Sequence, residues 1–309
     1  MSLRHSTQRN EDDREREVAY LAHQRLTAGA PLRVPGVAIT GHCQAVGAVG
    51  GDWWLASALP DGRVLVAVGD VTGHDLAAAF MAVSARGVVD GAIRVLGAEA
   101  TPARVMATLD AALASLGELG REMTAAILVI DPTLGRLDLA SAGHPFPFVR
   151  RARGTLDVVV ARGAPLGSAA AAIGVARTEL EPGDLILVST DGLPDRAGDD
   201  GRRFGDRRLR RLLLEHTPES TTNVHRLRAD ILAALRGFAA VTAADDDLTM
   251  VVCEFRAYVL DGVERRRDEA TAVPELCPDH EVSAAFAAAM AIEDGHDTTK
   301  MTLWSPASS

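Results

Sequence analysis

The stretch GGDWWLASALPDGRVLVAVGDVTGHD, residues 50–75, carries an aspartate at the far end of each arm of a predicted apolar hairpin. The run LPDGR, residues 59–63, is a turn signal between the two arms. A three-residue loop at Pro60–Gly62 sets Asp52 directly opposite Asp70, with side-chain bases about 5 Å apart. A bulge at the double glycine would shift this register by one residue.

Two like charges at that separation are unfavourable unless a cation or a shared proton lies between them. Three further aspartates flank predicted buried strands: Asp191 follows one, and Asp246 and Asp247 precede another. Each alone is more typical of a turn or a helix cap. Together they favour an oxygen-rich site of the kind that Mg²⁺ or Mn²⁺ prefers. A pair of such ions activates a bridging water and neutralises a phosphoryl group, so no protein nucleophile is required.

Composition narrows the class of protein. The chain has 309 residues, and its net charge of −10 argues against a general nucleic-acid or anionic-membrane surface. Its three cysteines are far apart in the sequence, which favours a reducing compartment over a disulfide framework. We identify no apolar stretch near the roughly 20 residues of a membrane helix, and no apolar core of a signal peptide. The sequence therefore predicts a cytoplasmic protein without a membrane partner.

The order of elements predicts an α+β fold. Hairpins alternate with helix pairs, which argues for antiparallel layers and against a parallel βαβ sheet. The predicted helices cover residues 75–96, 101–118, 206–216 and 220–239, and a last strand covers 248–255. We expect three segments: a charged helix and linker over 1–34, a catalytic domain over 35–256, and a C-terminal extension over 257–309 that includes a helix at 281–293.

Residues 10–27 read as one charged helix with a thin apolar stripe. The stripe consists of Val18, Leu21, Ala22 and Leu26. Two interpretations remain open: a solvated helix that leans on the body of the protein, and a helix that pairs with a partner or with a second copy to form a homodimer.

Six motifs make the chain resemble the metal-dependent protein serine/threonine phosphatases, the PPM family, in the bacterial branch typified by SpoIIE and RsbU. They are VGAVGGDWW (46–54), VAVGDVTGHDLAAAFM (66–81), LASAGHPFPFVRR (139–151), GAPLG (163–167), LEPGDLILVSTDGLPD (180–195) and DDLTMVV (246–252). The resemblance implies a four-layer α-β-β-α sandwich, in which two antiparallel sheets are flanked by helix pairs, and two Mn²⁺ or Mg²⁺ ions at the sheet edge.

Carried over by position, the resemblance also implies roles for individual residues. Asp70 bridges both ions, the Val71 carbonyl adds a ligand, and Asp52 binds one ion directly or through water. Asp191 and Asp246 bind the other ion. Asp247 stands where the family often has asparagine, which favours Asp246 as the ligand of the two.

Two positions depart from the family pattern. Leu55 replaces a second acid after GGD, so an auxiliary carboxylate is missing, and Asp75 stands where glycine is common. His74 has two interpretations, as a proton donor to the leaving oxygen or, more commonly, as a cap of the following helix.

The predicted function is hydrolysis of phosphoserine or phosphothreonine on a regulatory protein. By resemblance, the substrate is an anti-sigma-factor antagonist in a partner-switching pathway. The alternatives are a pseudophosphatase that serves as an interaction module and a metallohydrolase of small phosphate esters.

Overall fold

The structure is a computed structural model that describes residue 14 and residues 17–115, 121–167, 172–216 and 223–256. Contacts divide the chain into two units, Met1–Leu260 and Asp261–Ser309. The following description concerns the first unit. The helix predicted over 281–293 lies outside the described residues.

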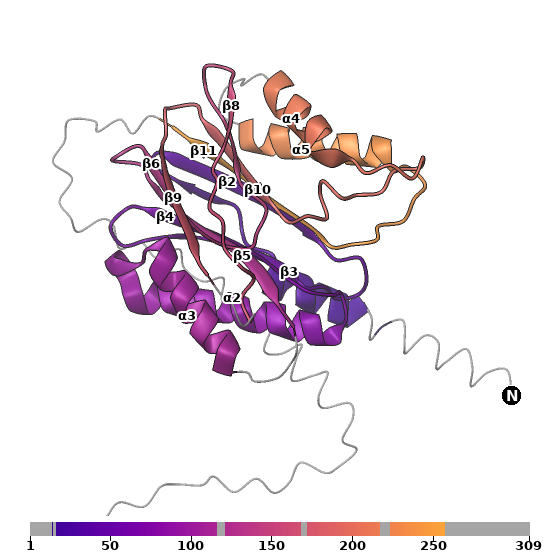
Figure 1. Ribbon diagram of the computed structural model, residues 1–309, viewed down its shortest axis with the longest axis horizontal. Coiled ribbons are helices and arrows are strands. Elements are labelled where there is room, and N and C mark those ends of the chain that lie inside the picture. The colour runs from indigo at the N-terminus through magenta and orange to yellow at the C-terminus, as the bar shows by residue number, and fades with distance from the viewer. Residues whose placement is uncertain (1–13, 15–16, 116–120, 168–171, 217–222, 257–309) are drawn as a thin grey trace, which may run out of the picture. The chain divides into compact units, whose positions relative to one another are not determined.

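Two antiparallel sheets form the centre of this unit (Figure 1). The first sheet has the order β3-β4-β5-β6-β9, with bounds Asp52–Ala58, Val64–Val71, Met123–Asp131, Arg136–Ala142 and Gly174–Glu179. The second has the order β1-β2-β11-β10-β7-β8, with bounds Leu32–Val34, Val37–Gln44, Leu248–Phe255, Leu185–Ser189, Phe148–Arg150 and Leu156–Val158.

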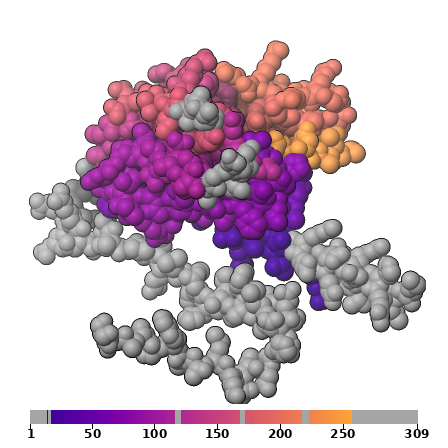
Figure 2. Space-filling view, turned by 60° about the horizontal axis from the view of Figure 1, so that its bottom comes forward, coloured from indigo at the N-terminus to yellow at the C-terminus, as the bar shows by residue number. Residues whose placement is uncertain are grey.

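A helix pair covers the outer face of each sheet. Helices α2 (Leu76–Leu96) and α3 (Pro102–Ser115), joined by the short 3₁₀ helix η1 (Gly97–Glu99), contact β3, β4, β5 and β6. Helix α5 (Asn223–Phe238) contacts β2 and β11, and α4 (Gly205–Glu215) packs beside it. In Figure 2 the purple α2–α3 layer and the orange α4–α5 layer lie on separate sides. The predicted four-layer α-β-β-α sandwich is confirmed.

The first sheet is buried on both faces, and the alternation of its side chains sorts them into two cores. Trp53 belongs to the core under α2 and α3, whereas Trp54 belongs to the core between the sheets. Along β4, Leu65 and Ala67 face the helices, and the valines at even positions face the other sheet. A strand period of two requires this division, so the adjacent tryptophans lie on opposite faces of the sheet.

Strand β9 was not predicted from the sequence. It lies at the edge of the first sheet, paired only with β6 among the described strands, and its side chains are alternately half-buried and exposed. Val175, for example, is 67% exposed. The sequence of a strand with one solvent-exposed face shows only weak hydrophobic character, because the side chains on that face need not be apolar.

Helix α2 corrects the expectation that no apolar segment approaches membrane length. The segment Leu76–Glu99 has 24 residues and a mean hydropathy of 1.5, enough by length and composition alone for a membrane span. A core helix of a soluble fold passes the same test, and α2 buries Ala78, Ala82, Ala85 and Val89 in the core that it shares with β3 and β4.

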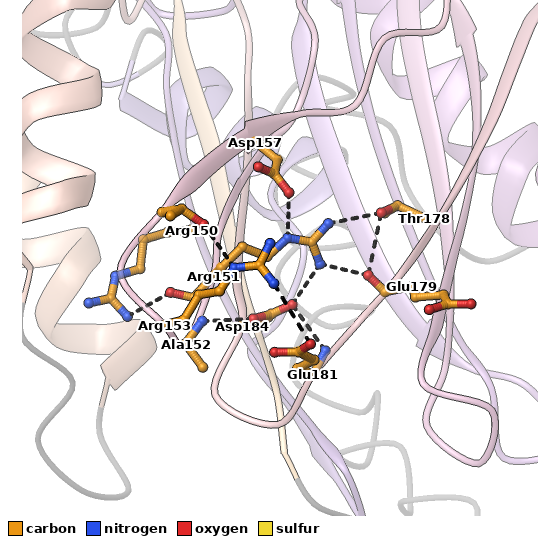
Figure 3. Close-up of polar contacts among 10 residues, drawn as sticks. Arg150, Arg151, Ala152, Arg153, Asp157, Thr178, Glu179, Glu181 and Asp184 are labelled. Atoms are coloured by element: carbon orange, nitrogen blue, oxygen red, sulfur yellow. Dashed lines mark hydrogen bonds and ion pairs between the residues drawn. The ribbon is translucent and has the colours of Figure 1, made fainter.

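A polar cluster around Arg151 ties the two sheets together at the start of β10 (Figure 3). Arg151 donates to Asp157 Oδ2 at 2.7 Å and Asp184 Oδ2 at 2.8 Å, both from the second sheet or its turns. It also donates to the carbonyl of Glu179 at 2.6 Å and the hydroxyl of Thr178 at 2.9 Å, both in β9 of the first sheet. This cluster lies at the opposite end of β10 from Asp191.

Candidate active site

Asp52 and Asp70 are directly opposite each other on β3 and β4. The turn that sets this register is closed by Leu59 N–H, which donates to the Arg63 carbonyl at 2.8 Å. The predicted pairing is therefore confirmed, with no bulge at the double glycine within this ladder. Like charges directly opposite each other destabilise a sheet unless something offsets them.

Both aspartates lie on the sheet face that looks toward the second sheet, because they alternate in step with Trp54 and Val68. Thr190, at the end of β10 in the second sheet, donates its hydroxyl to Asp52 Oδ2 at 2.8 Å. Asp52 is 2% exposed. Burial, followed by the charges of Asp70 and Asp247, raises its pKa well above the usual value for an aspartate.

Asp70 lies at the centre of the acidic group. Burial is the largest cause of its altered titration, and the nearby carboxylates of Asp191, Asp246 and Asp247 add to it. Together they raise the pKa of Asp70 to about 7. Asp191 and Asp246 also act on each other, since the charge of Asp191 contributes, after burial, to a raised pKa of Asp246. The fold thus brings the acids of four different strand ends into one electrostatically coupled group.

Asp246 and Asp247 have different environments. Asp247 is 4% exposed, and its two carboxylate oxygens accept from Val46 N at 2.8 Å and Gly51 N at 2.6 Å. Asp246 is exposed and accepts one hydrogen bond, from the backbone N–H of Asp247 at 2.9 Å. Asp247 therefore anchors the loop that leads to Asp52, whereas Asp246 is exposed and interacts electrostatically with Asp191.

The double glycine of GGD is required by close packing. A Cβ atom at Gly50 would overlap the Asp247 carboxylate, and one at Gly51 would overlap the carbonyl oxygens of Val71 and Gly73. The Val71 N–H in turn donates to the Gly51 carbonyl at 3.2 Å. The Val71 carbonyl, which the family resemblance implies is a metal ligand, thus packs against the backbone of Gly51, the residue before Asp52.

The chemistry of this group fits a hard divalent cation. It offers the carboxylates of Asp52, Asp70, Asp191 and Asp246 with a carbonyl beside them, and such oxygen donors suit Mg²⁺ and Mn²⁺. Ion pairs in the described ranges engage other acids, such as Asp195 and Asp245, and none includes these four. Among the described residues, no three acidic, histidine or cysteine side chains are already arranged as a metal-ligand set.

Comparison with known proteins agrees with this geometry. The family model for stage II sporulation protein E, SpoIIE, matches residues 60–256. The chain belongs to the SpoIIE family. The phosphatases of this branch are PPM-type serine/threonine protein phosphatases, so this SpoIIE-family chain is an enzyme of that class.

Solved structures share the fold. The SiaA-PP2C domain of Pseudomonas aeruginosa is 22% identical, with a TM-score of 0.68 over 80% of this chain and 98% of that domain. The structure of the RsbU and RsbW domains of Rv1364c from Mycobacterium tuberculosis is 28% identical, with a TM-score of 0.62 over 76% of this chain and 63% of that one. RsbX, solved in complex with magnesium, is 17% identical, with a TM-score of 0.55 over 73% of this chain and 98% of RsbX.

Leu55, where relatives carry a second acid, does not face the acidic group. It is 3% exposed and lies with Trp53 in the core under α2 and α3, on the opposite side of β3 from Asp52. The expectation that Leu55 removes an auxiliary carboxylate from the metal site is therefore wrong for this chain, because strand alternation points position 55 away from it.

The capping interpretation of His74 is also wrong. Asp75 is the N-cap of α2, and its Oδ1 accepts from Ala78 N at 3.0 Å. Arg121 donates to the other oxygen of Asp75 at 2.5 Å and to the Thr72 carbonyl at 2.6 Å. The departure from glycine at position 75 thus produces a cap and an ion pair that hold the loop after Asp70. His74 is exposed.

Two residues near the acidic group were not predicted from the sequence. Thr190 bonds Asp52, and its place immediately before Asp191 was the available signal. Thr124, the β5 partner of Asp70, bonds His144 Nδ1 at 2.9 Å. Burial lowers the pKa of His144 to about 3. His144 is therefore a neutral, buried structural residue.

Proposed function

We propose that this phosphatase hydrolyses phosphoserine or phosphothreonine on a regulatory protein, with two Mn²⁺ or Mg²⁺ ions held by the acidic group. The observation that carries the proposal is the pair Asp52 and Asp70, directly opposed on one sheet and coupled to acids of the other. Such a pair is stabilised by a cation or by a retained proton. The ions, when bound, lower the pKa of a water between them and offset charge on the phosphoryl group.

The residues divide this work between them. Asp70 is the central acid and the proposed bridging ligand, with Asp52 on one side and Asp191 and Asp246 on the other; the Val71 carbonyl completes the set. Thr190 orients Asp52 through its 2.8 Å hydrogen bond. Because both oxygens of Asp247 are engaged by backbone N–H groups, we assign Asp247 the positioning of the loop before Asp52 instead of direct ligation.

Family membership supports a proposal for the substrate class. A relative carries RsbU and RsbW domains in one chain, which supports a phosphorylated anti-sigma-factor antagonist as the substrate and a place in partner switching. We also propose a cytoplasmic location, in keeping with the cysteine usage, and a homodimer formed through the N-terminal helix. Val18 and Leu21 of that helix are 62% and 52% exposed and thus open to a partner.

A phosphoprotein assay tests the proposal. Manganese-dependent release of phosphate from a phosphoserine protein is expected, with nucleotides poor substrates. Asp70→Asn, which removes a charge at nearly constant volume, should abolish turnover while the fold remains. Asp90→Asn is the matched control, because Asp90 lies on α2, where it forms an exposed ion pair with Arg94.

Each rival predicts a different result. A pseudophosphatase shows no turnover at any metal concentration. A metallohydrolase of small esters prefers nucleotides or sugar phosphates over the phosphoprotein. Turnover of Asp70→Asn within a few-fold of the unchanged protein would refute the assignment of the acidic group as the catalytic centre.

A further inference from the structure

The N-terminal helix contacts the catalytic body with its polar side. Residues 17–27 are helical, and their buried positions are His23, 6% exposed, and Thr27, fully buried. The apolar stripe faces outward instead, with Leu26 49% exposed and Leu21 52% exposed. Burial of a polar side in preference to an apolar one indicates that specific hydrogen bonds, and not apolar area, determine how this helix docks.

Those hydrogen bonds end on the segment that leads to Asp52. His23 Nε2 lies 2.8 Å from the carbonyl oxygen of Gly50. Gln24 donates to the Cys43 carbonyl at 3.3 Å. The Thr27 hydroxyl donates back to the His23 carbonyl at 2.8 Å, which fixes the last turn of the helix beneath the histidine.

The loop before Asp52 is thus held from two sides. On one side Asp247 accepts from Gly51 N–H at 2.6 Å and from Val46 N–H at 2.8 Å. On the other side His23 holds Gly50, the residue next to Gly51. Neither glycine has a side chain, so hydrogen bonds and the close packing of the backbone against Asp247 and Val71 position this segment.

The ring of His23 is suited to this contact as a neutral donor. Burial is the main influence on the ring and lowers its pKa, so that it carries one N–H near neutral pH. The Gly50 N–H also lies 3.3 Å from Nε2, but one nitrogen cannot donate and accept along both contacts. The shorter distance assigns the proton to Nε2, which donates to the Gly50 carbonyl.

We propose that His23 is a positioning residue of the metal site, which fixes Gly50 and thereby places Asp52 for metal binding. The proposal rests on the proposed function only in taking Asp52 as a ligand. Groups that orient metal ligands change metal affinity about 10–100-fold when they are removed. Docking of the N-terminal helix is then coupled to metal affinity through one side chain.

The test compares four variants of the full chain. His23→Leu keeps the side-chain bulk and removes the hydrogen bond, His23→Ala removes both, and His23→Gln retains an N–H donor. Arg25→Ala, at an exposed position of the same helix, is the control for helix propensity. Two quantities are measured: the rise of the melting temperature in a Mn²⁺ titration, and the Mn²⁺ concentration for half-maximal turnover of a phosphoserine protein.

We expect His23→Leu and His23→Ala to need at least 10-fold more Mn²⁺ in both measurements, while the rate at saturating Mn²⁺ stays within a few-fold. His23→Gln should return the requirement to within about threefold, and Arg25→Ala should not change it. An unchanged Mn²⁺ requirement in folded His23→Leu would overturn the proposal, as would a Gln variant no better than Leu. If His23→Ala does not fold, the Leu and Gln variants decide.

The melting titration separates this inference from the function. If the unchanged protein binds Mn²⁺ but shows no phosphatase activity, the proposed function fails while the His23 comparison still holds. If the unchanged protein binds Mn²⁺ and turns over substrate, and the His23 variants equal it, the function stands and the inference fails.

Discussion

Asp70→Asn should stabilise the metal-free protein at neutral and alkaline pH. Burial and the neighbouring acids raise the pKa of Asp70 to about 7, from an ordinary value of 3.8. Below about pH 4 the carboxyl is protonated in both the folded and the unfolded chain. As pH rises toward 7, the unfolded chain releases this proton and the folded chain keeps it, so the free energy of unfolding falls by about 1.4 kcal/mol per pH unit.

The full difference over that window is on the order of 4 kcal/mol, and above pH 7 it no longer grows. This is an upper value, because solvent reaches the half-buried Asp70 side chain and screens part of the repulsion. For a domain of this size, each kcal/mol shifts the melting temperature by about 2–4 °C. Asp70→Asn should therefore melt up to roughly 8–16 °C above the unchanged protein at pH 8, and the gap should shrink to less than half by pH 5.

Scanning calorimetry in a chelating buffer between pH 5 and 8.5 measures this gap, with Asp90→Asn as the control for loss of an exposed charge. Addition of Mn²⁺ should narrow the gap, since a ligand at 100 times its Kd adds about 2.7 kcal/mol to a protein that binds it and the variant lacks the central acid. An Asp70→Asn protein that is equally or less stable than the unchanged chain at pH 8 without metal would refute the argument that burial and the neighbouring acids make the ionised Asp70 unfavourable.

Three further outcomes are expected. Asp184→Asn removes the charged partner of the buried Arg151. Because breaking a buried ion pair costs about 3–5 kcal/mol, the urea midpoint of unfolding should fall while the Mn²⁺ concentration needed for activity stays the same. A change in that Mn²⁺ concentration would contradict the separation of the Arg151 cluster from the metal site. Gly50→Ala forces a Cβ into the Asp247 carboxylate and should weaken Mn²⁺ binding at least 10-fold by titration, whereas equal binding would show that the loop yields. Replacing Leu21 and Leu26 by serine should lower the molar mass measured by light scattering while each monomer still folds. An unchanged molar mass would refute the proposal that the apolar stripe forms the dimer contact.

Local signals were sufficient for much of the fold. The turn Leu59–Arg63 and the lengths of the two arms determined that Asp52 lies opposite Asp70, because antiparallel register propagates from the loop. Successive side chains of a strand point to opposite faces of the sheet, and this places Trp53 and Trp54 on opposite faces. The start of the helix predicted over 101–118 depends on a local signal as well, because Thr101 Oγ1 accepts from Arg104 N at 3.3 Å as an N-cap residue does.

Several features of the site depended on contacts between residues far apart in the chain. Asp247 accepts hydrogen bonds from a loop almost 200 positions earlier, at separations of 201 and 196 residues, so adjacency to Asp246 gave no indication of its different role. Thr190 reaches Asp52 only because the two sheets face each other.

The sequence by itself determined the hairpins, the helix pairs, the oxygen-donor chemistry and the register of the first two acids, because these depend on turn geometry and on periods of two or 3.6 residues. Only the tertiary structure decided that the acids of both sheets form one coupled group, that Leu55 points away from it, and that the N-terminal helix docks through His23 with its apolar stripe outward. These outcomes depend on which distant surfaces meet, and the energy of a buried charge or hydrogen bond is set by its surroundings and not by its neighbours in sequence.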